Sequence, residues 1–184
     1  MKELSLHILD IGQNSVTAGA SLIEILITED TALDKLCILI RDDGCGMDAE
    51  TVAKVTDPFY TTRTTRKVGL GIPMFKANAE LCEGSFRLQS APGAGTELEA
   101  AFRRSHIDRV PLGDMADTIM AMVMANPQGD LIYRHSLDQR VFQVDTREMR
   151  AALGGVALDE VEVLLWVKGY VAEGLAEIGV APDS

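Results

Sequence analysis

Residues 40–48, IRDDGCGMD, place three aspartates and two glycines directly after an apolar run. A solvated turn, a calcium loop and a helix N-terminus rich in acids would each suit this composition. So would a ligand pocket that needs one carboxylate and a close approach of the backbone. A calcium loop requires ligand oxygens at alternating positions and a distal bidentate glutamate, which DDGCGMDAETV does not supply. The motif alone does not decide among the solvated turn, the helix N-terminus and the ligand pocket.

A second pair of polar residues lies near the N-terminus. Asp10 and Asn14 are four residues apart in a segment with helical spacing of Leu4, Ile8 and Ile11, so both lie on one helical face. Such a pair is either part of a functional site or simply a solvated face. His7 lies one turn earlier, and we expect a histidine on the helix surface with no chemical role.

Composition narrows the class of protein. The chain has 184 residues, 47% hydrophobic and 24% charged, enough for one core or one core with a small module. The net charge of −11 disfavours a nucleic-acid or anionic-membrane binder. No signal peptide is apparent, and TIMAMVMA falls far short of the roughly 20 residues of a spanning helix. Three cysteines without C-x-x-C spacing indicate reduced thiols in the cytoplasm rather than a metal site.

Hydrophobic periodicity predicts a regular order of elements through residue 104. The order is a helix, two strands, a short helix, a loop, a helix and two strands, which indicates a two-layer α/β sandwich with helices on one face of a mixed sheet. Asp48 is the expected N-cap of the short helix. The predicted helices are 2–19, 48–56 and 74–84, the strands are 22–28, 35–41, 85–91 and 95–104, and the irregular loop is 57–73.

The pattern changes near residue 105. We predict one domain over 1–104 and an accessory region over 105–184, a small α+β extension that either packs on the first domain or binds a partner. The methionine-rich helix suits an adaptable partner surface, but packing against the sheet is the favoured interpretation. The predicted elements are a linker at 105–114, helices 114–126, 146–153 and 158–178, and strands 130–136 and 140–146.

Four separated motifs resemble one superfamily. They are DIGQNSVTAGA (10–20), DDGCGMD (42–48), DPFYTTR with VGLGIP (57–63 and 68–73), and GAGTELEAAF (93–102). In this order they resemble the N, G1, F and G2 boxes and the final Gly-Thr motif of the GHKL ATPases, which include gyrase, Hsp90, histidine kinases and MutL-type proteins. The resemblance covers about residues 4–103 and implies the Bergerat nucleotide-binding fold. The N and G1 boxes are similar to those of MutL, and the F and G2 boxes to those of sensor histidine kinases.

The resemblance implies the residues that would bind ATP. Asp42 would accept a hydrogen bond from the adenine amine. Asn14 would be the protein ligand of Mg²⁺. Asp10 would be the catalytic base, one methylene shorter than the usual glutamate, so hydrolysis is expected to be slow. The other nucleotide-binding residues would be Gly44, Gly46, Met47 and Thr96, together with Phe59, Thr62, Arg63, Lys67, Gly69, Leu70 and Gly71 of a lid and the helix start that follows it.

The implied function is that of a stand-alone regulatory module that binds Mg-ATP and resembles histidine kinases and anti-sigma-factor kinases. A slow conformational ATPase and a nucleotide sensor without turnover are the alternatives. Because the helix with Asn14 begins close to Met1, we expect no dimerisation helix with a phosphoacceptor histidine before it. A protein partner is expected, with no nucleic acid and no membrane, whereas the oligomeric state and the reaction stay open.

Overall fold

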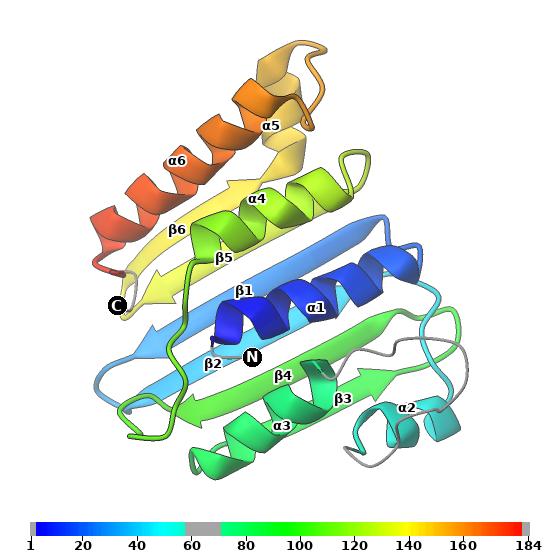
Figure 1. Cartoon of the computed structure of the whole chain (residues 1–184), viewed down its shortest axis with the longest axis vertical. Helices are drawn as coiled ribbons and strands as arrows, with labels where there is room; N and C mark the ends of the chain where they lie inside the picture. Colours follow the sequence, from blue (N-terminus) through cyan, green and yellow to red (C-terminus); the bar gives the residue numbers. More distant parts are fainter. Residues whose placement is uncertain (1–2, 58–70, 182–184) are drawn as a thin grey trace.

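A computed structural model describes residues 3–57 and 71–181 of the chain (Figure 1). The helices are α1 (Leu4–Thr17), α2 (Ala49–Val55), α3 (Gly71–Leu81), α4 (Met115–Ala125), α5 (Thr146–Leu153) and α6 (Val161–Ile178). The strands are β1 (Leu22–Asp30), β2 (Lys35–Asp42), β3 (Ser85–Ser90), β4 (Thr96–Arg103), β5 (Asp130–Leu137) and β6 (Arg140–Asp145).

The strands form one mixed sheet in the order β3-β4-β2-β1-β5-β6. β1 and β5 run parallel, and the other neighbouring pairs are antiparallel. Helices α3, α1, α4 and α6 lie side by side across one face of this sheet (Figure 1). The prediction of a two-layer α/β sandwich with a mixed sheet is therefore confirmed.

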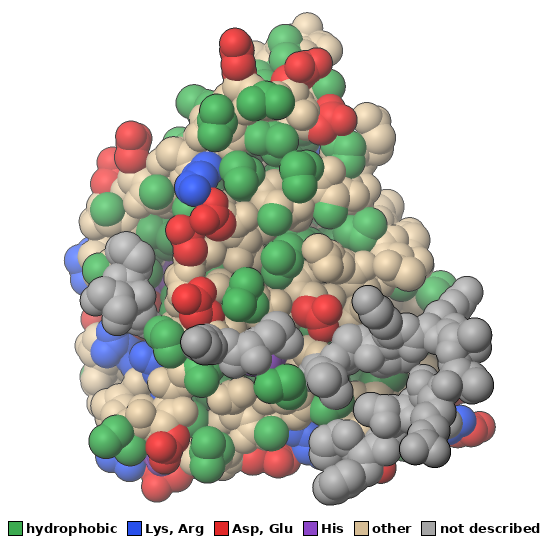
Figure 2. Space-filling model, viewed as in Figure 1, with side chains coloured by type: hydrophobic (Ala, Val, Ile, Leu, Met, Phe, Trp, Pro, Cys, Tyr) green, Lys and Arg blue, Asp and Glu red, His purple; other side chains and the backbone are tan. Residues whose placement is uncertain are grey.

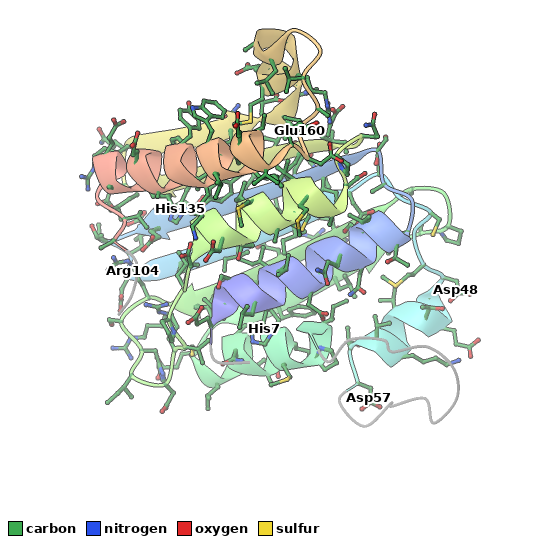
Figure 3. All side chains as sticks on the ribbon, turned by 45° about the horizontal axis from the view of Figure 1, so that its top comes forward. His7, Asp48, Asp57, Arg104, His135 and Glu160 are labelled. Atoms are coloured by element: carbon green, nitrogen blue, oxygen red, sulfur yellow. The ribbon has the colours of Figure 1, made fainter. Side chains whose placement is uncertain are left out.

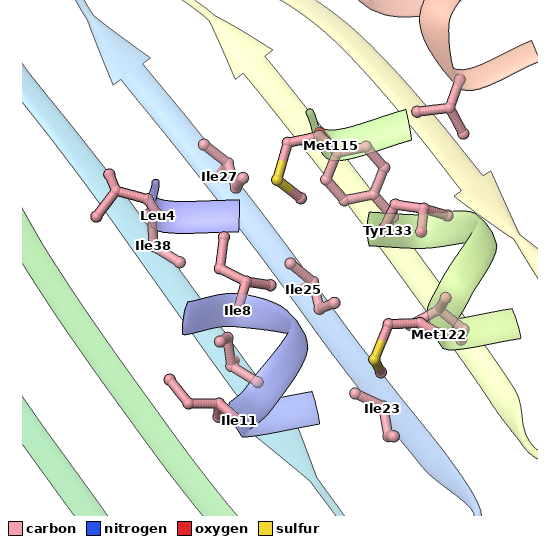
Figure 4. Close-up of a cluster of buried hydrophobic side chains, with 14 of the residues drawn as sticks. Leu4, Ile8, Ile11, Ile23, Ile25, Ile27, Ile38, Met115, Met122 and Tyr133 are labelled. Atoms are coloured by element: carbon pink, nitrogen blue, oxygen red, sulfur yellow. The ribbon is translucent and has the colours of Figure 1, made fainter. Parts of the chain in front are cut away.

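Alternation along the central strands creates the core. In β1, Ile23, Ile25 and Ile27 are buried under the helices, while the residues between them are more exposed. The helix α1 buries Leu4, Ile8 and Ile11 against them (Figure 4). Each such aliphatic side chain contributes about 1.5–3 kcal/mol through removal from water, so this layer fixes α1 on the sheet.

Gly12 of α1 packs against Met122 of α4. A Cβ on Gly12 would lie 2.4 Å from the terminal methyl of Met122, so a larger residue there would require the Met122 side chain to move. Met115 and Met122 of α4 are buried in the core, whereas Met124 is exposed. Part of the methionine-rich helix therefore packs against the sheet.

The region after residue 105 joins the same sheet and the same hydrophobic core, because β5 pairs with β1 from Leu22↔Asp130 to Glu29↔Leu137. A buried polar chain crosses this pairing. The Tyr133 hydroxyl lies 2.8 Å from His135 Nδ1, and His135 Nε2 lies 2.9 Å from Glu29 Oε1. Arg104 Nε donates to the other oxygen of Glu29 over 2.8 Å. Arg104 and His135 are labelled in Figure 3. This chain of hydrogen-bonded polar side chains links β5, β1 and the segment after β4.

One predicted boundary is wrong. The segment Gly71–Pro73 was expected to be irregular, but α3 begins at Gly71. Pro73 lies in the first turn, where its missing N–H would have no helical partner anyway. This start matters because it defines where the positive end of the α3 dipole lies.

Candidate functional site

Asp42 is the last residue of β2, and its side chain is held by two donors. The Ser15 hydroxyl of α1 donates to Oδ2 over 2.6 Å, and the Gly44 N–H donates to Oδ1 over 2.9 Å. Each carboxylate oxygen can accept two hydrogen bonds, so both keep capacity for a further donor. The carboxylate is partly buried and fixed in direction, as a ligand acceptor must be.

The neighbouring Asp43 is engaged elsewhere. It accepts hydrogen bonds from the Ser21 hydroxyl, from Ser21 N at 2.7 Å and from Leu22 N at 2.9 Å. These bonds, the Ser21 hydroxyl first, hold the pKa of Asp43 below its usual value. Asp43 therefore fastens the start of β1, and Asp42 is the aspartate of this pair with capacity for a ligand.

Thr96 lies directly beside Asp42 in the sheet. Asp42 pairs in register with Thr96 of β4, and Thr96 pairs with Ser90 of β3. The Ser90 hydroxyl donates to Gly95 O over 2.8 Å and accepts from Met47 N over 2.8 Å. Since its one hydrogen is used, Thr96 is the donor in the 3.0 Å contact between the two hydroxyls. We call Ser15, Asp42, Gly44, Ser90 and Thr96 the Asp42 cluster.

Two glycines allow the loops around this cluster to approach one another. Gly46 has φ +68°, and a Cβ there would lie 2.0 Å from Ala91 O. Gly95 has φ +75°, and its Cβ would lie 2.0 Å from Asp42 O. Both positions combine a left-handed backbone with contact to another main chain, which only glycine permits.

Asp10 meets the start of α3. The Gly71 N–H donates to Asp10 Oδ2 over 3.1 Å, and a Cβ on Gly71 would lie 2.1 Å from that oxygen. The first N–H groups of a helix have no partner in the helix and carry its positive dipole end, which makes them a binding site for anions. In this structure a side-chain carboxylate uses one of them.

Asn14 lies one helical turn beyond Asp10 and is exposed. An exposed amide oxygen fits a Mg²⁺ ion that reaches the protein mainly through phosphate oxygens, because Mg²⁺ takes few protein ligands in such sites. Within residues 3–57 and 71–181, no three His, Cys, Asp or Glu side chains are grouped to hold a metal. A role of Asn14 in holding Mg²⁺ stays a prediction.

The prediction for His7 is wrong in one respect. His7 is fully buried, not on the helix surface, and its ring lies 5.7 Å from that of Phe75 in α3. The helix face that bears His7 is covered because α3 packs directly on α1. Neither ring nitrogen has a hydrogen-bond partner.

Six predicted nucleotide-binding residues cannot be placed. They lie outside the described residues and are Phe59, Thr62, Arg63, Lys67, Gly69 and Leu70. The structure brings Asp42, Gly44, Gly46, Met47 and Thr96 together at one end of the sheet, and it joins Asp10 to Gly71. These placements leave the roles of the residues as predictions.

Sequence reasoning missed Ser15 and Ser90. Ser15 follows Asn14 directly, but a single serine in a helix gives no sign that it contacts a strand end 27 positions later. Ser90 ends β3, where a polar residue is ordinary. The register that joins Ser90 to Thr96 becomes visible only once β3 and β4 are paired.

The fold is an α/β sandwich, a mixed sheet with helices across one face. The chain belongs to the family of histidine kinase-, DNA gyrase B- and HSP90-like ATPases, whose sequence profile matches residues 2–106. This confirms the resemblance found in the four sequence motifs. The family match and the relatives of this chain support an ATP-binding, histidine kinase-like module.

Relatives of this chain include bacterial sensor proteins. It is 29% identical over 109 residues to a putative sensor protein of Shewanella frigidimarina, 58% of this chain and 17% of that protein. It is 32% identical over 91 residues to the heme sensor protein HssS of Staphylococcus saprophyticus, covering 49% and 19%. It is 35% identical over 89 residues to the sensor protein kinase FleS of Pseudomonas aeruginosa, covering 48% and 22%. The matched region spans about a fifth of these relatives.

Two further findings concern membrane-spanning helices and the charge of the surface. In the part of the chain that the structure describes, every helix is too short or too polar to cross a bilayer. On the face in Figure 2, acidic side chains are scattered among apolar ones over the region of α4 and α6. This distribution agrees with the net charge of −11.

Proposed function

We propose that this chain binds Mg-ATP at the end of β2 and acts as a regulatory, histidine kinase-like module on a protein partner. Asp42 accepts the exocyclic amine of adenine, with Gly44, Gly46, Met47 and Thr96 around the base. The observation that carries the proposal is the fixed direction of the Asp42 carboxylate, held by Ser15 and Gly44 with acceptor capacity left over.

At the other end of the nucleotide, the phosphates lie at the N-terminus of α3. The Gly71 N–H is a donor for an anion there, and it already binds one carboxylate oxygen of Asp10. Asn14 holds Mg²⁺, which neutralises phosphate charge when bound. Asp10 orients the attacking group or removes its proton.

Transfer to a partner is favoured over rapid hydrolysis by the state of Asp10. Its carboxylate accepts a hydrogen bond from Gly71 N–H, and its side chain is one methylene shorter than glutamate. A general base must come within hydrogen-bond reach of its proton, so water is activated slowly. A slow conformational ATPase is the second candidate, supported by the same engagement. A protein partner and a cytoplasmic location are parts of the proposal.

The test follows the γ-phosphate. The protein is incubated with γ-labelled ATP and Mg²⁺, alone and with a cytoplasmic extract, beside an Asp42→Asn control. The proposal expects label on a protein of the extract, and this labelling should depend on Asp42. Without the extract, the protein should release little free phosphate. Free phosphate formed rapidly by the protein alone would identify the ATPase instead. Nucleotide binding without any transfer would contradict the kinase-like role and leave a sensor.

A further inference from the structure

His7 is a buried polar residue that the proposed site does not use. It lies on α1 three residues before Asp10, and α3 covers it through Phe75. Its exposed fraction is 0%, and neither ring nitrogen has a hydrogen-bond partner. Among side chains in the described residues, only this imidazole has buried nitrogen or oxygen atoms that lack a partner.

Such a group needs an explanation. A buried donor or acceptor without a partner costs about 1–3 kcal/mol, which a leucine at the same place would avoid. Burial is the largest influence on His7 and lowers its pKa below 6.5, so the ring is neutral at pH 7. A neutral imidazole keeps one N–H donor. The donor has no acceptor within hydrogen-bond geometry.

Two groups near this ring raise the His7 pKa against the effect of burial: the Gly71 backbone, through a contact outside normal hydrogen-bond geometry, and the charge of the Asp10 carboxylate. Positions 7 and 10 are neighbours on one side of α1, since residues three apart in a helix lie next to each other. The Asp10 carboxylate meanwhile accepts from Gly71 N–H over 3.1 Å. His7, Asp10 and Gly71 therefore form one contiguous group in which one donor is unused.

An anion at the N-terminus of α3 changes this balance. A phosphate oxygen that takes the Gly71 N–H removes a donor from Asp10, which is then a partly buried carboxylate short of a hydrogen bond. A charge-assisted hydrogen bond to a carboxylate is among the strong ones in proteins. The unused donor on the preceding turn of α1 is His7.

We propose that His7 is a positioning residue for Asp10: when a phosphate group takes the Gly71 N–H, an imidazole N–H of His7 donates to the Asp10 carboxylate and holds it beside the nucleotide. This inference rests on the proposed function. It adds that nucleotide binding and the His7–Asp10 hydrogen bond are coupled.

The test is a double-mutant cycle on nucleotide affinity. Calorimetry with Mg-ADP compares wild type, His7→Leu, Asp10→Asn and the double variant, with His7→Gln as the variant that keeps an N–H donor. His7→Leu is expected to weaken binding about tenfold, and His7→Gln much less. In the Asp10→Asn background, His7→Leu is expected to change affinity less than about twofold, because the acceptor carboxylate is gone.

Phe75→Leu is the matched control for packing, because it alters the same ring contact and removes no polar group. Phe75→Leu is expected to lower the unfolding temperature. Any effect on ADP affinity is expected to be the same in wild type and in the Asp10→Asn protein. Wild-type affinity in His7→Leu, or the same loss with and without Asp10, would overturn the pairing. A second result would also overturn the pairing: a His7→Leu protein that is clearly less stable than wild type when no nucleotide is added. That result would mean that the ring nitrogens of His7 have hydrogen-bond partners in the wild-type protein. Absence of ADP binding by wild type would instead contradict the proposed function and the pairing with it.

Discussion

The hydroxyl of Ser15 donates to Asp42 over 2.6 Å, so a side chain of α1 sets the direction of a carboxylate at the end of β2. This bond joins α1, which carries Asp10 and Asn14, to β2, which carries Asp42. The second donor, Gly44 N–H, comes from the loop after β2. The carboxylate is thus held by donors from two different segments of the chain.

Ser15→Ala tests this support. Loss of the hydroxyl lets the carboxylate rotate and is expected to weaken ADP binding by roughly three- to tenfold, with about 0.5–1.5 kcal/mol lost from the free energy of unfolding. Thr17→Ala is the matched control, because Thr17 lies on the same helix and its hydroxyl donates only to Gln13 O over 3.0 Å. Calorimetry and urea unfolding measure both effects. Equal ADP affinities for the two variants would remove Ser15 from the site.

Gly46→Ala tests the loop that follows Asp42. A left-handed backbone costs an alanine about 1–2 kcal/mol, and the 2.0 Å approach to Ala91 O forces the loop to move at further cost. Gly93→Ala is the control, since Gly93 has φ +76° but open space around it. We expect both variants to lose stability and only Gly46→Ala to lose ADP affinity. Unaltered binding in Gly46→Ala would show that this loop does not line the site.

Cys45 supplies a chemical probe of the same loop. Its thiol is exposed, whereas Cys37 is half-buried and Cys82 is buried. Burial also raises the pKa of the Cys82 thiol, so less of the reactive thiolate forms there. N-ethylmaleimide is therefore expected to modify Cys45 first, and Mg-ADP to slow that reaction while leaving Cys37 unchanged. Peptide mass mapping over time gives both rates. A Cys45 rate that ADP does not alter would place the nucleotide elsewhere.

Glu29 makes the acid sensitivity of the fold predictable. Burial is the largest influence and raises its pKa, but hydrogen bonds and charge from His135 and Arg104 outweigh it and leave the pKa below 4.5. An acid with a lowered folded pKa stabilises the protein above its unfolded value of 4.5, and this contribution is lost as the pH falls below it.

Glu29→Gln should therefore lose about 1–3 kcal/mol of unfolding free energy at pH 7 and depend less on pH between 5 and 3 than wild type. The exposed pair of Glu50 and Lys54 provides the control, because Glu50→Gln removes a surface ion pair worth under about 1 kcal/mol. Urea unfolding at several pH values distinguishes the two. Parallel pH profiles of wild type and Glu29→Gln would contradict this role of the polar chain.

Much of the fold could be predicted because its signals are local. Alternating Ile and Leu in 22–28 and 35–41 determine both faces of the central strands, and the Asp48 side chain caps α2 as expected, accepting from Thr51 N over 2.8 Å. The parallel pairing of β5 with β1 joins segments about a hundred residues apart, and no local pattern encodes it. Burial of His7 likewise depends on where α3 packs, which helical spacing alone does not determine.

The candidate site divides in the same way. Asp42, Gly46 and Gly71 could be predicted because the motifs that contain them resemble those of the GHKL ATPases, and their roles stay predictions. Ser15 and Ser90 could not, since a hydroxyl becomes significant only when folding brings it to an acceptor. The two aspartates 42 and 43 could not be separated in sequence by their own neighbours. Their hydrogen bonds separate them in the structure.

Recognition of adenine by Asp42 is tested most directly by measuring the affinities of ADP and inosine diphosphate for wild type and for Asp42→Asn. The inosine base carries a carbonyl oxygen where adenine carries its amine, so at that position it presents an acceptor to the carboxylate instead of a donor. Wild type is expected to prefer ADP by about 1.5–3 kcal/mol, and Asp42→Asn to lose most of that preference through weaker ADP binding. The same ADP preference in both proteins would contradict the assignment of Asp42 as the residue that reads adenine.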